Sequence, residues 1–168
     1  YLPLFEKGMN SVSNSVKANS LAAIAAVDPS RIASLADKID LEGADEEVIA
    51  ELMPIIVKNK IEKQMAAIAS TVAFYPFIKF QKPELGDAAE AGFNWIMSSD
   101  HLKATENVTK VLTQVKGQIS QNPQTKMMIV QILKDGLEKK MVVLKANPSS
   151  STIHQQIDLI NKTIEAYK

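Results

Sequence analysis

Apolar side chains recur at helical spacing along most of the chain. Steps of four and three residues separate the first set, Phe5, Met9, Val12 and Val16, and this is the period of one helix face. Similar patterns cover 48–72, 108–119 and 127–146. No segment alternates apolar and polar residues between turn signals, as a half-buried strand would. The pattern therefore predicts an all-α protein.

Helix boundaries are marked by capping residues and prolines. Asp28-Pro29 and Pro83-Glu84 are typical of helix starts, and Asn122-Pro123 separates two apolar segments. We expect the first helix to run from Leu4 to Val27, or to divide at Asn19 and Ser20. The segment 48–72 is expected to form one long helix that is bent or broken near Pro54, because proline removes a backbone hydrogen bond inside a helix.

The connections between these segments are short, which favours antiparallel packing of neighbouring helices. A chain of 168 residues can bury one substantial core. We therefore predict a single helical domain over residues 1–168, an antiparallel bundle of about six to seven helices. Residues 127–146 carry apolar side chains on more than one face, so this helix is expected to be central.

Charge and composition narrow the classes of function. The chain has 19 basic and 19 acidic residues, and Arg31 is the only arginine, so no excess positive charge would attract a nucleic acid. There is no cysteine, which excludes disulfides, thiolate metal sites and cysteine nucleophiles. The sequence thus predicts no nucleic-acid partner.

The sequence also carries signals relevant to membranes and processing. No apolar run reaches the roughly 18–20 residues that a transmembrane helix needs, and the nearest, Met65 to Ile78, contains Pro76. We therefore expect no transmembrane segment. The sequence starts at Tyr1, which suggests a processed mature protein, either secreted or organellar.

Residue patterns that support catalysis are missing. The two histidines, His101 and His154, do not lie at the spacing of a helical metal pair from each other, and there is no H-E-x-x-H motif. There is no G-x-S-x-G turn and no glycine-rich phosphate loop. Paired carboxylates such as Glu46 and Glu47 stand where a helix start favours negative charge. We expect no enzyme activity, no catalytic residue, no metal and no cofactor.

Two apolar features are candidates for binding. An aromatic segment carries Phe74, Tyr75, Phe77 and Phe80, and Trp95 follows in the next predicted helix. We expect this aromatic segment either to fill the core beneath a bend between helices, as a core plug, or to form the mouth of an apolar pocket. The last helix bears a narrow, coiled-coil-like seam of Ile153, Ile157, Ile160 and Ile164.

These features support two hypotheses about function. The first is a non-enzymatic helical scaffold or assembly subunit, which would associate with a protein partner or with itself through apolar helix faces. It depends on the isoleucine seam and on the broad apolar surface of residues 127–146. The second is a carrier of an apolar small molecule, a lipid or a pigment, held between helices beside the aromatic segment.

Overall fold

The computed structural model describes all residues from 1 to 168 and contains eleven α-helices and no strand. The all-α prediction is therefore confirmed, although the helices outnumber the six or seven expected. The helices are α1 (Leu2–Gly8), α2 (Asn14–Val27), α3 (Ile32–Leu35), α4 (Glu46–Lys58), α5 (Met65–Val72), α6 (Tyr75–Gln81), α7 (Pro83–Met97), α8 (Leu102–Gln114), α9 (Lys116–Ile119), α10 (Pro123–Ala146) and α11 (Ser151–Ala166).

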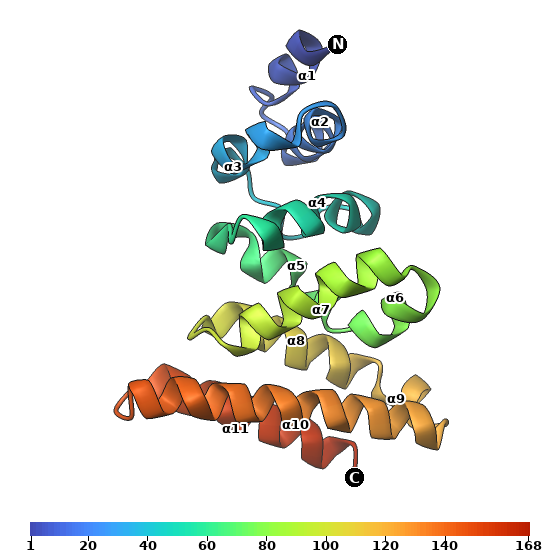
Figure 1. Cartoon of the computed structure of the whole chain (residues 1–168), viewed down its shortest axis with the longest axis vertical. Helices are drawn as coiled ribbons and strands as arrows, with labels where there is room; N and C mark the ends of the chain where they lie inside the picture. The colour runs from blue at the N-terminus through green and yellow to red at the C-terminus, as the bar shows by residue number, and fades with distance from the viewer.

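The helices pack in successive layers along the longest axis of the molecule (Figure 1). The N-terminus lies at one end of this stack, and the α10–α11 hairpin closes the other end. Contacts link α1 to α2, α2 to α4, α4 to α7, α5 to α8, and α8 to α11. One apolar cluster of 35 buried residues extends from Met9 to Tyr167. This continuous core joins the layers into the single domain that the sequence predicts.

The extra helices arise from breaks that the apolar pattern does not reveal. The first predicted helix is divided between Gly8 and Asn14, where Ser13 caps α2 by accepting the Val16 amide, and not at Asn19 and Ser20. A Cβ on Gly8 would lie 1.9 Å from the Ser20 hydroxyl oxygen. The absence of a side chain on Gly8 therefore lets α1 fold back closely against α2.

The long helix expected over 48–72 is interrupted, but the interruption does not lie at Pro54. That proline sits inside α4, which continues to Lys58. Lys60 then adopts a left-handed backbone conformation with φ of 51°. The Lys60 amide bonds the Val57 carbonyl at 3.2 Å, and the Ile61 amide bonds the Ile56 carbonyl at 3.1 Å. This pair of bonds is a Schellman motif, which ends the helix by satisfying its last carbonyls.

Pro76 and Pro83 begin helices, since each occupies the first turn of its element, α6 and α7 respectively. The start of α7 is as predicted. The next helix, α8, is capped by His101. Its ring Nδ1 accepts the Ala104 amide at 3.1 Å, so the ring nitrogen replaces the usual hydroxyl or carboxylate.

The α10–α11 hairpin is peripheral, whereas the sequence places its first helix at the centre. Only one face of α10 is buried, comprising Ile129, Ile132, Leu133, Gly136 and Lys140. Its other apolar residues remain accessible, and Met127 is 72% exposed. The chain has no further layer beyond α10 and α11 (Figure 1), so Met127, Met141 and Val142 stay exposed, whereas Val130 and Leu137 are partly buried against the core.

Two buried glutamines connect neighbouring layers of the molecule. Gln64 donates to the carbonyls of Ala36 and Ile39 at 2.7 and 2.8 Å and accepts the Leu41 amide at 3.3 Å. Gln156 of α11 donates to the Asp100 carbonyl at 2.8 Å. These side chains supply the hydrogen bonds that backbone groups in the turns would otherwise lack.

Candidate functional site

The aromatic segment 74–80 lies between two apolar cavities. The first cavity is lined by α6 and α10, and we call it the α6–α10 groove. Its volume is about 510 Å³ and it opens widely to solvent. The lining residues are Tyr75, Pro76, Lys79, Phe80, Met128, Gln131, Ile132 and Asp135. It therefore combines an apolar floor with a polar rim, as protein-binding grooves often do.

Phe80 is the most exposed bulky side chain of the groove, with 91% of its surface accessible. Tyr75 is half-buried, and its ring packs 5.3 Å from that of Phe93. Burial raises the pKa of the Tyr75 phenol, and the negative charges of Glu90 and Asp135 raise it further. The groove thus presents an uncharged phenol on its floor and a phenyl ring to solvent.

The charged residues at the rim of the groove are engaged with their neighbours. The Lys79 ammonium lies 2.6 Å from Glu90 and 3.4 Å from Asp87, and hydrogen bonds to these carboxylates raise its pKa. Asp135 accepts a 2.9 Å hydrogen bond from Gln131. Because these groups already have partners, the groove offers mainly apolar contacts.

The second cavity lies on another side of α6, and we call it the α4–α5–α6 pocket. Its volume is about 450 Å³, and seven of its 11 lining residues are hydrophobic. The lining comprises Gly43, Ala44, Glu46, Ile49, Ala50, Ala67, Ser70, Thr71, Phe74, Ile78 and Val111. Small side chains from α4 and α5 leave the space, and Phe74 with Ile78 forms one wall. This size falls within the range of small-molecule sites.

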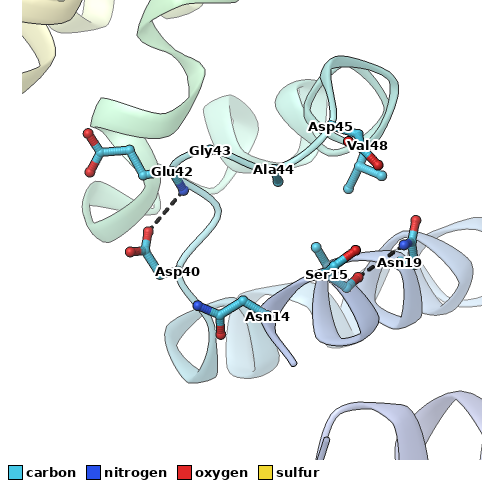
Figure 2. A pocket seen from close by; sticks show the side chains of 10 residues that line it. Asn14, Ser15, Asn19, Asp40, Glu42, Gly43, Ala44, Asp45 and Val48 are labelled. Atoms are coloured by element: carbon cyan, nitrogen blue, oxygen red, sulfur yellow. Dashed lines mark hydrogen bonds between the residues drawn. The ribbon is translucent and has the colours of Figure 1, made fainter. Parts of the chain in front are cut away.

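A third, polar cavity lies where α2 approaches the loop before α4 (Figure 2). It encloses about 160 Å³. Its polar groups bond to one another locally: Asp40 accepts the Glu42 amide at 2.9 Å, and Asn19 donates to the Ser15 carbonyl at 3.0 Å (Figure 2). No group of histidine, aspartate and glutamate residues in the chain is arranged to hold a metal ion. We therefore assign these carboxylates to local turn structure.

The aromatic candidates divide between the two apolar cavities. Tyr75 and Phe80 line the α6–α10 groove, and Phe74 lines the α4–α5–α6 pocket. Phe77 packs 6.2 Å from Phe74 between ring centres. Trp95 lies elsewhere, beneath the Lys60 ammonium at 5.1 Å. Phe74, Phe77 and Tyr75 are all half-buried against the core, so the segment both packs against the core and borders two openings.

The isoleucine seam of α11 lies inside the chain. Ile153, Ile157, Ile160 and Ile164 are all at most 8% exposed, and α11 packs against α8 and α10. The seam is therefore occupied by intramolecular contacts in this fold. An aspartate at Ile157 or Ile160 would place a charge in the core and would test folding rather than association.

Several residues at these sites were missed by the sequence reasoning. Lys79, Met128 and Asp135 meet at the groove because α6 and α10 both pack against α7, and no local sequence pattern predicts that arrangement. The burial of Lys140, by contrast, could have been predicted from the sequence. Lys140 follows Ile129, Leu133 and Gly136 at helical spacing, which places it on the buried face of α10.

Lys140 is fully buried and donates hydrogen bonds to the carbonyls of Ile96 and Ser99 at 2.9 and 2.7 Å. Desolvation lowers its pKa to about 7, against a weaker opposing effect from Asp100. These carbonyls lie at the C-terminal end of α7, where a cation also interacts favourably with the helix dipole. Lys140 therefore joins α10 to the turn between α7 and α8.

No helix of the chain combines the length and apolar character that crossing a membrane requires. Comparison with family models, curated proteins and solved structures finds no match to this chain. Inference about function therefore depends on the geometry of the two apolar cavities beside α6.

Proposed function

We propose that this chain is a non-enzymatic helical scaffold that binds a protein partner, or a second copy of itself, through the α6–α10 groove. The observation that carries the proposal is the exposure of Phe80, which lines the groove with 91% of its surface accessible. On α10, Met127 is 72% exposed and precedes the lining residue Met128, although it is not itself part of the lining. Aromatic and methionine side chains are enriched at protein interfaces.

The accessible surface of the molecule supports the same proposal. A compact monomer of 18.4 kDa is expected to expose about 8,200 Å². This chain exposes 9227 Å², an excess of roughly 1,000 Å² over that expectation. One side of a standard protein interface covers about 800 Å². The layered shape thus provides surface on the scale that a partner would cover.

The proposal is tested by replacing Phe80 with serine and Met127 with glutamine in the same chain. If the protein self-associates, light scattering should show a smaller particle for this variant than for the native protein. Val12→Ser is the matched control, because Val12 is fully exposed in the segment between α1 and α2. An oligomer that forms equally well in both variants would contradict self-association through the groove.

Binding of another protein, rather than a second copy of the chain, is tested by placing a photo-crosslinking phenylalanine analogue at position 80. The same analogue at position 12 is the control. We expect a crosslinked protein specific to position 80 that is lost when Met127 is replaced with glutamine. A monomer at every concentration, together with equal crosslinking from both positions, would refute the scaffold function.

A second function, carriage of an apolar small molecule, is favoured by one specific observation. The α4–α5–α6 pocket provides about 450 Å³ of space with mostly hydrophobic walls, enough for a small lipid-like molecule. Its opening is independent of the α6–α10 groove, because no residue lines both cavities. The two functions can therefore be tested by separate substitutions.

A further inference from the structure

Three neighbouring cavities form one continuous depression on the side of the molecule. The α4–α5–α6 pocket shares four lining residues, among them Ala67 and Ser70, with a cavity of about 270 Å³. That cavity shares Lys110 and Gln114 with a third one, of about 460 Å³, which lies between α8 and α11. Cavities that share lining residues adjoin each other, and we call the three together the lateral cleft.

The lateral cleft crosses four successive helices. Its helical lining comes mainly from α4, α5, α8 and α11, and α4 contacts α5, α5 contacts α8, and α8 contacts α11. These helices follow one another along the longest axis of the molecule (Figure 1). Packed helix axes lie about 8–10 Å apart, so three such steps span roughly 25–30 Å. An extended polypeptide rises about 3.3 Å per residue, and about eight residues would cover this length.

The walls of the lateral cleft change in polarity along its length. At the α4 end, most lining residues are hydrophobic, and Ile49, Phe74 and Ile78 are the bulky ones. The middle cavity has only three hydrophobic residues among its nine, and its lining includes the carboxamides of Asn107 and Gln114. At the α11 end the accessible wall is again mainly apolar. One hydrocarbon chain would have to cross the polar middle, so the whole cleft suits a ligand with apolar groups at both ends and polar groups between them.

The polar middle of the cleft can exchange hydrogen bonds with a polypeptide backbone. The Asn107 amide nitrogen donates to the Ala66 carbonyl at 3.0 Å and to the Glu42 carboxylate at 3.4 Å, and its carboxamide oxygen can still accept. The Gln114 carboxamide can both donate and accept. A polypeptide backbone offers one N–H and one C=O per residue, whereas a hydrocarbon offers neither. The middle of the cleft therefore favours a polypeptide over a lipid.

The charged side chains of the cleft narrow the choice of ligand further. Lys110 and Lys162 line the α11 end together with one carboxylate, Glu106. Neither lysine takes part in any of the five ion pairs of the chain, so an acidic side chain of the ligand is favoured there. Glu42 and Glu46 also line the cleft, and together with Glu106 they disfavour a polyanion such as a single-stranded nucleic acid.

We propose that the lateral cleft binds an extended segment of a partner protein. The segment carries two bulky apolar side chains, one in the α4–α5–α6 pocket and one in the cavity between α8 and α11, and an acidic side chain beside Lys110 and Lys162. The two apolar sites are about two helix spacings apart, which an extended chain covers with about five or six residues. Because no residue of the cleft lines the α6–α10 groove, the inference adds a second binding surface to the proposed scaffold.

Selection of random dodecapeptides displayed on phage, with the full chain immobilised, tests the inference without knowledge of the partner. We expect the enriched peptides to share two bulky apolar residues about five or six positions apart and an acidic residue near one of them. Fluorescence anisotropy with a labelled enriched peptide then gives its dissociation constants for the native chain and for variants.

Two substitutions test the apolar ends of the cleft separately. Ala67→Phe fills the α4 end and Ala166→Trp fills the α11 end. Each should weaken peptide binding by about tenfold, the worth of one buried apolar side chain, while circular dichroism stays helical. Ala146→Trp is the matched control for Ala166→Trp, because each alanine is the last residue of its helix and Ala146 is exposed. This control should leave the affinity unchanged.

Reversal of the two lysine charges tests the acidic residue of the ligand. Lys110 and Lys162 are exposed, so their replacement by glutamate should leave the fold intact. The double variant should weaken peptide binding by about tenfold, because two favourable charge interactions become repulsive. Lys116→Glu with Lys145→Glu makes the same change in net charge at exposed positions outside the cleft and should leave the affinity unchanged.

Phe80→Ser separates this inference from the proposed function, since Phe80 lines only the α6–α10 groove, and it should leave peptide binding unchanged. Enriched peptides whose binding is lost in Phe80→Ser would occupy that groove and would overturn the inference. Absence of enrichment over an unrelated immobilised protein would also overturn it, as would peptide binding that survives Ala67→Phe, Ala166→Trp or the double lysine reversal. If no peptide is enriched, saturable binding of 1-decanol that Ala67→Phe abolishes would assign the pocket to the carrier function instead.

Discussion

Lys140 gives the protein a specific dependence of stability on pH. The amine is fully buried, and desolvation lowers its pKa to about 7 in the folded state. In the unfolded chain the same amine should titrate near the ordinary lysine value of about 10.4. Between these two values the unfolded state binds more protons than the folded state, so the free energy of unfolding should rise with pH.

The sign and size of this effect follow from the two pKa values. Below about pH 7 the amine is charged in both states, and the full cost of burying the charge is present. Above that pH the folded protein carries a neutral amine, and the cost is removed progressively until the unfolded amine also deprotonates. Each pH unit in this window changes stability by up to ~1.4 kcal/mol. From pH 7 to pH 9 the expected gain is ~2 kcal/mol.

Lys140→Met isolates this contribution, since methionine fills similar space without a titrating group. The variant leaves the Ser99 carbonyl without its Lys140 donor, whereas the Ile96 carbonyl still accepts the Ser99 amide and hydroxyl. It should therefore lose stability at pH 9 by roughly 1–3 kcal/mol, the cost of one unpaired group. At pH 6 the loss should be smaller by about 2 kcal/mol, because the native protein then buries a charge.

Urea unfolding at pH 6, 7, 8 and 9, followed by circular dichroism, measures the difference between native and variant proteins. Lys134→Met is the control, because Lys134 is exposed on the same helix and should leave the pH profile unchanged. Parallel pH profiles for the native protein and Lys140→Met would refute the argument that the buried amine governs this dependence.

Two further predictions concern packing between layers. Gln64→Leu removes three hydrogen bonds to the turn 36–41 and should lower the free energy of unfolding by ~2–4 kcal/mol; a loss below about 1 kcal/mol in urea unfolding would contradict this role. Gly86→Ala places a Cβ 2.2 Å from the Lys79 Cα and should cost ~2–3 kcal/mol, because α6 must move away from α7. Gly117→Ala meets no atom within 4 Å and should raise the melting temperature slightly. Equal effects of the two alanines on thermal unfolding would refute the close α6–α7 contact.

The helical character and several boundaries of this protein are determined locally. Apolar spacing of three and four residues is a property of the sequence itself, and Asn122 with Pro123 begins α10 through bonds to residues nearby. The start of α7 at Pro83 was predictable for the same reason. Each of these features depends on a few consecutive residues, so no knowledge of the tertiary structure is needed.

The break after Lys58 was not predictable from the proline that precedes it. Pro54 is tolerated inside α4, whereas Lys60, a residue with no turn preference, adopts the left-handed conformation that ends the helix. The left-handed conformation of Lys60 places Ile61 in the buried core. Packing of Ile61 therefore stabilises a backbone conformation that lysine rarely adopts. Local propensity therefore predicted a break in this region but placed it wrongly.

Only the tertiary structure decided which apolar faces remain available for binding. Periodicity shows that the seam of α11 and the broad face of α10 are both apolar, but it does not show what each contacts. Packing against α8 and α10 buries Ile157 and Ile160, whereas Met127 and Phe80 stay exposed because no further helix covers them. A sequence pattern defines a face, and the choice of partner for that face depends on residues far apart in the chain.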